Sequence, residues 1–242
     1  MIKKIIMLIA VLFLSYSTAA FSSVTMLKTR IIYSSDSRFE VLKFMNNDDI
    51  PYIMQIWADK NNPNSTPDNA DAPFIIQPPV FRIDPKIGRD ARLIYIGEGL
   101  PQDKESLFYL NIAQIPPKNL NQDIKEGNSF TVIVHHRLKI FYRPSAIESQ
   151  INNVEKQITF LKDTNGNITV KNNSPFFVSF ASLEATNTSG QKFAFKSTMI
   201  SPLSTETLLP ETNNKLSFSP DKITYKYLND LGGQNSATYL IH

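Results

Sequence analysis

The strongest constraint on the fold is one stretch near the middle of the chain, residues 128–144. Read with a period of two, its apolar face carries Phe130, Val132, Val134, His136, Leu138, Ile140 and Tyr142. This alternation predicts a β-strand with one apolar and one mixed face. At about 3.3 Å per residue the strand would be roughly 50 Å long, well beyond the usual length. It therefore either pairs along its whole length in a large sheet or leaves an edge open for a partner. An open apolar edge without a partner would be an aggregation hazard.

The rest of the chain also has the character of an all-β protein. Its 242 residues include 15 Pro and only 8 Gly, and runs of Val, Ile, Phe and Tyr alternate with turns marked by Pro and Asn. About seven strands at β-sandwich spacing precede Pro144, namely 29–33, 39–45, 52–58, 74–76, 80–83, 91–96 and 107–113. The pattern restarts more weakly at 158–161, 167–171, 176–180, 192–195 and 223–227, after a polar connection at 145–156 with room for a helical turn. The sequence predicts two β-sandwich domains, residues 21–144 and 145–242.

The first twenty residues are set apart from these domains. Lys3 and Lys4 precede an apolar run from Ile5 to Leu14, and small residues follow up to Ala20. This order is typical of a secretory signal peptide, and the apolar run is too short to span a bilayer. We expect the leader to be cleaved near Phe21 and the remainder to be exported without a membrane anchor.

Cysteine content and charge narrow the function further. The chain has no cysteine, so an exported protein of this kind must be held together by its cores alone, and thiol chemistry is excluded. There are 25 basic and 22 acidic residues. Without the two leader lysines the net charge is about +1, far from the basic excess of nucleic-acid-binding proteins.

No catalytic motif is present in the sequence. It contains no G-x-S-x-G elbow, H-E-x-x-H pair or phosphate-binding loop. His135 and His136 are neighbours on a predicted strand, so they point to opposite faces and cannot share a metal ion. Trp57 is expected in the core, and Arg30, taken alone, as a solvent-facing strand residue. The residues alone leave three function classes open: a chaperone, a surface adhesin or fibre subunit, and a hydrolase on a β scaffold. A hydrolase would need a convergent acid/base set, which is missing. We therefore expect no enzyme activity, cofactor, metal or small-molecule substrate.

Several short motifs follow one another along the chain in a specific order. In the first half they are TRIIY at 29–33, PY at 51–52 with Gln55 and Trp57, PFI at 73–75 through PPVFR at 78–82, KESLFYLN at 104–111 with IPP at 115–117, and LKIFYRP at 138–144. In the second half they are NSPFF at 173–177, MISP at 199–202 and LNDLGG at 228–233. Together they resemble the PapD-type periplasmic chaperones of pilus assembly over nearly the whole chain.

The resemblance implies a fold and a mechanism. It implies two immunoglobulin-like domains set in an L around a cleft. A chaperone of this type works in the periplasm and lends its long strand to a pilus subunit that lacks one, a mode called donor-strand complementation. It then delivers the subunit to an outer-membrane usher. The alternative, a secreted β-sandwich adhesin or fimbrial structural subunit, would end in a subunit-like pairing motif and lack the cationic pair described next.

The resemblance also assigns roles to individual residues. Phe130, Val132 and Val134 would be the donated side chains. Arg30 and Lys139 would hold the terminal carboxylate of the subunit in the cleft, and Lys139 lies on the opposite face of the strand from the donated side chains. A charged network between the domains would be formed by Glu105, Arg143 and Asp230. The free protein has the further option of associating with itself through the same edge strand.

Two features depart from the commonest family pattern. The loop at 118–128 is a little longer than in short-loop members, but it lacks the cysteine pair of long-loop members, which favours the short-loop class. In the second domain Phe160 stands where an aromatic residue such as tryptophan is usual, and the disulfide of some members is missing.

Overall fold

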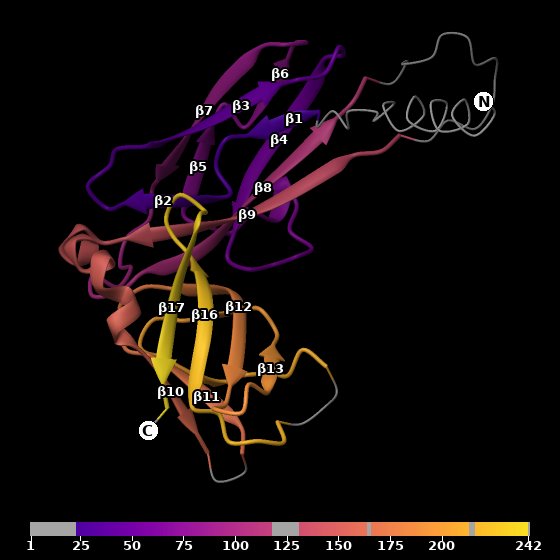
Figure 1. Cartoon of the computed structure of the whole chain (residues 1–242). Coiled ribbons are helices and arrows are strands. Elements are labelled where there is room, and N and C mark those ends of the chain that lie inside the picture. The colour runs from indigo at the N-terminus through magenta and orange to yellow at the C-terminus, as the bar shows by residue number, and fades with distance from the viewer. Residues whose placement is uncertain (1–22, 118–130, 164–165, 213–215, 242) are drawn as a thin grey trace, which may run out of the picture.

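The computed structural model describes residues 23–117, 131–163, 166–212 and 216–241, which form two β-sandwich domains in sequence order (Figure 1). The expected signal peptide, the segment 118–130 and with it Phe130 lie outside the described residues. Within the described part of the chain, no helix has the length and apolar character needed to cross a membrane.

The first domain packs a four-stranded sheet against a five-stranded one. The smaller sheet has the order β1 (Val24–Met26), β3 (Glu40–Asn46), β7 (Gly88–Tyr95), β5 (Phe74–Gln77). The larger has the order β2 (Arg30–Ser34), β9 (Val134–Arg143), β8 (Ser106–Ile115), β4 (Tyr52–Asp59), β6 (Val80–Ile83), and a short 3₁₀ helix, η1 (Pro67–Asn69), follows β4. Between the sheets lie alternate apolar side chains, among them Ile31, Tyr33, Leu42, Leu93, Leu110 and Ile140. The pair β2–β9 is parallel, so β2 and β9 run in the same direction along the side of the domain.

The second domain begins with a 3₁₀ helix, η2 (Ser145–Gln157), where the sequence suggested at most a helical turn. One sheet has the order β10 (Ile158–Lys162), β11 (Ile168–Asn172), β15 (Ser204–Thr207). The other has the order β13 (Lys192–Phe195), β12 (Val178–Thr186), β16 (Lys222–Leu228), β17 (Gln234–Leu240), with β14 (Thr198–Ile200) also paired to β12. Phe160 lies at the centre of the core, with ring contacts to Phe180, Tyr225 and Tyr239.

Each domain contains one fully buried asparagine at the end of a strand. In the first domain the amide of Asn46 donates to the carbonyl oxygens of Ile50 and Asp84 at 2.8 and 3.1 Å. In the second, Asn172 donates to Phe176 O and Ser201 O at 2.7 and 2.9 Å. Buried backbone carbonyls need such partners, so each asparagine fixes two loops at once.

The all-β fold and the two immunoglobulin-like domains predicted from the sequence are confirmed by this architecture. The domains form an L in Figure 1, with the end of β9 and η2 at the corner and the β16–β17 turn reaching the first domain. Four strands were missed, β1, β14, β15 and β17.

The prediction of one continuous strand over 128–144 was wrong in its first part. Residues 131–133 are described but are not in a strand, and β9 begins only at Val134. The last ladder pair joins Val134 to Gln114, and β8 ends one residue later, before Pro116 and Pro117. Because proline cannot donate to a ladder, β9 loses its partner there and the regular strand ends.

Candidate functional site

Arg30 and Lys139 lie directly opposite each other on the parallel strands β2 and β9. Both side chains point away from the core, because their neighbours Ile31 and Ile140 are the buried residues on these strands. Arg30 is only 8% exposed, and its Nε has no hydrogen-bond partner. The expectation of a solvent-facing arginine is therefore wrong, and the sequence motif that paired Arg30 with Lys139 was the better guide.

Electrostatics make this pair unusual. Burial lowers the pKa of Lys139, and the charge of Arg30 lowers it further. Burial also lowers the pKa of Arg30, although the carboxylates of Asp230 and Glu105 oppose that shift. Two adjacent cations with incomplete solvation and an unused donor favour the binding of an anion.

The edge of β9 is half covered. Strand β2 pairs with residues 139–143 of β9, whereas β8 pairs with residues 134–142 on the other side. Residues 134–138 therefore have an edge that no described strand occupies. Val134 in this open half is 37% exposed and Val132, just before the strand, is 74% exposed. On the same face, Leu138 packs against the core, and Ile140, in the covered half, is fully buried.

The three residues predicted to link the domains are in direct contact. Arg143 Nε donates to Glu105 Oε1 at 2.8 Å, and its two terminal nitrogens donate to the carboxylate of Asp230 at 2.6 and 2.8 Å. Glu105 Oε2 accepts a hydrogen bond from the backbone N–H of Phe177 at 2.8 Å. Burial raises the pKa of Glu105 in spite of Arg143 and the Phe177 N–H, which lower it. For Arg143, the carboxylates of Asp230 and Glu105 overcome burial, which alone would lower its pKa, and the net shift is upward.

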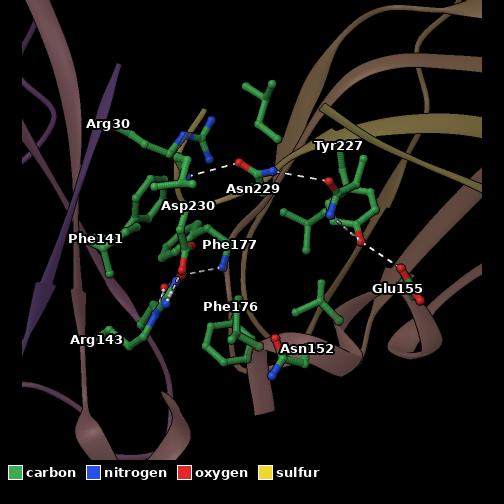
Figure 2. A pocket seen from close by; sticks show the side chains of 18 residues that line it. Arg30, Phe141, Arg143, Asn152, Glu155, Phe176, Phe177, Tyr227, Asn229 and Asp230 are labelled. Carbon is green, nitrogen blue, oxygen red and sulfur yellow. Dashed lines mark hydrogen bonds and ion pairs between the residues drawn. The ribbon is translucent and has the colours of Figure 1, made fainter. Parts of the chain in front are cut away.

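Aromatic rings surround these charges on the second domain's side. The Arg143 guanidinium lies 5.0 Å from the ring centroid of Phe176, and the rings of Phe141 and Phe177 are 5.7 Å apart across the domain boundary. A pocket of about 360 Å³ opens beside them, lined by both domains (Figure 2). Arg30 lines one end, and Glu155, which accepts a hydrogen bond from the Tyr227 hydroxyl at 2.9 Å, lines the other.

A second cluster lies on the same outer face of the larger sheet as Arg30 and Lys139, and it was not predicted from the sequence. Trp57 is buried as expected, but it lies outside the packed cluster between the sheets and its ring stacks on His135, with centroids 5.2 Å apart. Next to it, Arg137 Nη2 donates to the fully buried carboxylate of Asp59 at 2.7 Å. These contacts join residues 78 positions apart in the sequence, and no local pattern signals them.

This arrangement suits binding rather than covalent chemistry. Its cations sit beside an unoccupied strand edge, which can extend the sheet by main-chain hydrogen bonds. Among the described residues, no three His, Asp or Glu side chains are grouped so as to hold a metal ion.

Comparisons with known proteins agree on one family. The first part of the chain, residues 23–148, matches the model of the pili and flagellar-assembly chaperone PapD N-terminal domain, and residues 153–239 match that of the pili assembly chaperone PapD C-terminal domain. The chain is 34% identical to the chaperone protein HifB of Haemophilus influenzae, covering 96% of this chain and 94% of HifB. It is 29% identical to the chaperone protein PapD of Escherichia coli, over 98% and 94% of the two chains. The crystal structure of the YadV chaperone superposes with a TM-score of 0.75 at 27% identity, covering 90% of this chain and all of that one.

The family models cover both domains, and the relatives match almost from end to end. The chain is a member of the PapD family of pilus-assembly chaperones.

Proposed function

We propose that this chaperone captures fimbrial subunits on the open edge of β9 and delivers them to an outer-membrane usher. The observation that carries the proposal is the point where the open edge ends, because β2 begins there at Arg30, directly opposite Lys139. A strand added to residues 134–138 would extend the sheet by main-chain hydrogen bonds and place one of its ends beside these two cations.

The cations also fix the direction of the bound strand. A strand lying in line with β2 meets Arg30 either with its C-terminus or with its N-terminus. A terminal carboxylate would be attracted to Arg30 and Lys139, whereas a terminal ammonium would be repelled. The subunit strand therefore ends at the cations and runs parallel to β9. Charge-assisted hydrogen bonds of this kind are worth about 1.5 to 3 kcal/mol each.

The exposed apolar face of the strand supplies the rest of the affinity. Val132 and Val134, and by the family resemblance Phe130, would complete the sandwich of a subunit that lacks one strand. Burying such a side chain fully contributes about 1.5 to 3 kcal/mol. The carboxylate contact would then set the register, while these side chains provide most of the burial.

The charged link holds the two domains at the angle that forms the cleft. Arg143 bridges Glu105 of the first domain and Asp230 of the second, so that the pocket lined by both domains stays next to Arg30. The domains would extend over residues 21–144 and 145–242, and neither would carry out catalysis.

The protein works in the periplasm, as a member of this chaperone family. We propose that residues 1–20 are removed on export, with cleavage near Phe21. Before a subunit binds, the open edge is available to a second copy of the chain, and sedimentation of the free protein will show whether such self-association occurs.

Capture from the periplasm tests the function directly. A tagged protein is purified from periplasmic extract, and the proteins bound to it are identified by mass spectrometry. We expect fimbrial subunits with the wild type, and their loss with Arg30→Ala or Lys139→Ala at an unchanged melting temperature. Lys192→Ala is the matched control, because Lys192 is an exposed cation paired with Glu184 in the second domain. Wild-type capture by Arg30→Ala would refute the carboxylate site.

A further inference from the structure

The outer face of the larger sheet carries a row of long side chains that cross from β9 to β4 over the intervening strand β8. Arg137 and Trp57 are both in register with Asn111 of β8, and His135 and Gln55 are both in register with Ala113. The contacts are diagonal: His135 stacks on Trp57, and Arg137 reaches Asp59. On β8, the small residue Ala113 lies between His135 and Gln55, whereas Arg137 reaches Asp59 by passing over the Tyr109 ring.

Asp59 is at the centre of this arrangement and has a full set of hydrogen bonds. Its Oδ1 accepts from Arg137 Nη2 and from the backbone N–H groups of Asn61 and Asn62, each at 2.7 Å. Its Oδ2 accepts from Asn111 Nδ2 at 2.5 Å. Burial alone would raise the pKa of Asp59, but these hydrogen bonds together hold it below the ordinary value. The Asp59 carboxylate is therefore negatively charged at neutral pH and compensates the positive charge of Arg137.

Arg137 would otherwise resemble the anion-binding residues. It lies on the same strand and face as Lys139, two residues earlier, a separation of about 6 to 7 Å along the strand. Its Nε is buried without a partner, as is that of Arg30. Its guanidinium lies over the Tyr109 ring, 3.8 Å from the centroid. Without Asp59, Arg137 would be an unpaired cation with unused hydrogen-bond donors beside the open edge.

The other cations around the open edge are paired in the same way. Lys28, which precedes β2, contacts Glu40, and Arg143 contacts Glu105 and Asp230. Within the part of the chain that the structure describes, Arg30 and Lys139 take part in no ion pair. The charge pattern thus leaves one position on the edge for an anion.

We propose that Asp59 is a positioning residue that sets the register of the bound subunit: it engages Arg137, so that the terminal carboxylate is held at Lys139 and Arg30 and not two residues earlier. This proposal rests on the carboxylate site proposed above. It assigns Asp59 a part in specificity, since a strand shifted by two residues keeps the same side chains facing the chaperone but leaves the subunit incompletely filled.

Cross-linking measures the register directly. The chain has no native cysteine, so Ile133→Cys provides a single thiol on the exposed approach to β9. The probe is a set of synthetic peptides that copy the C-terminal strand of the co-purified subunit, each with one cysteine and a free carboxylate. The position that forms a disulfide reports the register, and amidated peptides show whether the terminal charge sets it.

Asp59→Asn should add a second cross-link, to a peptide residue two positions closer to the C-terminus. About a tenth of the complexes should shift, because the shifted strand has one charge-assisted contact, to Arg137, in place of the two to Arg30 and Lys139. In the background of Lys139→Gln, which by itself weakens capture, Asp59→Asn should yield the two registers in roughly equal amounts. Adding Arg137→Gln to Asp59→Asn should abolish the shifted cross-link, a rescue that a merely structural role for Asp59 would not produce.

Glu184→Gln, which frees Lys192 in the second domain, is the control and should leave the register unchanged. If Asp59→Asn does not fold, His135→Lys places an unpaired cation on the exposed part of the same strand face and should add a cross-link four positions closer to the C-terminus in about a tenth of the complexes. An unshifted cross-link in the folded variant would overturn the proposal.

If Arg30→Ala abolishes capture while Asp59→Asn keeps the wild-type register, the register proposal alone fails. If Arg30→Ala still captures subunits, the carboxylate site fails as well.

Discussion

Glu105 of the first domain accepts a hydrogen bond from the backbone N–H of Phe177 in the second domain, at 2.8 Å. Its other carboxylate oxygen accepts one from Arg143, and Arg143 in turn holds Asp230 with two hydrogen bonds. Because one of these contacts is made to the main chain, the link between the domains depends on the position of the backbone at Phe177 and not only on side chains.

Arg143→Ala should loosen the angle between the domains. The change leaves Glu105 buried with only the Phe177 N–H as a partner, and removing one member of a buried pair costs about 3 to 5 kcal/mol. Small-angle scattering should show a broader distribution of shapes than for the wild type. Arg82→Ala, which removes an exposed pair with Asp84, should not. An unchanged scattering profile for Arg143→Ala would contradict the role of the link.

Glu105→Gln should change how stability depends on pH. The folded-state pKa of Glu105 lies above the ordinary value of 4.5, so between these two values the folded state binds more protons than the unfolded state. The wild type should then gain stability relative to Glu105→Gln as pH falls through the raised pKa, and the difference should level off below about 4.5. Melting temperatures of both proteins from pH 4 to 8 test this. A difference that shrinks on acidification would show the opposite sign.

Val132→Glu and Val134→Glu should prevent subunit capture with little loss of stability. Val132 is 74% and Val134 37% exposed, so a charge there costs the free chaperone little, but it cannot be buried in a subunit. Ile140→Glu, on the same face but fully buried, is the contrasting variant and should cost several kcal/mol of folding stability. Melting temperature and capture are measured side by side. A large fall in melting temperature for Val132→Glu would mean that this face belongs to the chaperone's own core.

Asn46→Ala and Asn172→Ala should each destabilise one domain only. Each removes the partner of buried carbonyl oxygens, and each group left unsatisfied costs about 1 to 3 kcal/mol. Hydrogen exchange should show faster opening of β3 and β7 with Asn46→Ala, and of β11 and β12 with Asn172→Ala. Equal effects on both domains from either change would show that the two cores unfold as one unit.

The sequence predicted the strands whose pattern reflects burial on one face. Strand β17, with the sequence QNSATYL, was missed because it is a mostly exposed edge strand and few of its side chains meet the core. The start of β9 was placed too early because side-chain alternation continues beyond the last residue of β8 that can pair with it. Alternation describes the faces of a strand, but pairing decides where it ends.

The residues of the candidate site could be predicted from the sequence where they belong to family motifs. The family motifs predict Arg30, Lys139, Glu105, Arg143 and Asp230 as site residues, and the structure brings the first two and the last three together. The Asp59–Arg137 contact was not predicted, because it joins two strands separated by a third. Such diagonal contacts depend on sheet order and twist, which hydrophobic alternation does not encode.

The parallel strand β2 restricts the kind of chain that the chaperone can accept. It occupies the same edge of β9 as a bound strand would, beginning at Arg30 where the open part stops. A polypeptide that continued past this point would collide with β2, so an internal segment of a folded protein does not fit. Only a chain that terminates there can dock along the full open edge. The chaperone would thereby ignore the exposed edge strands of other proteins and select those whose final strand is still unpaired.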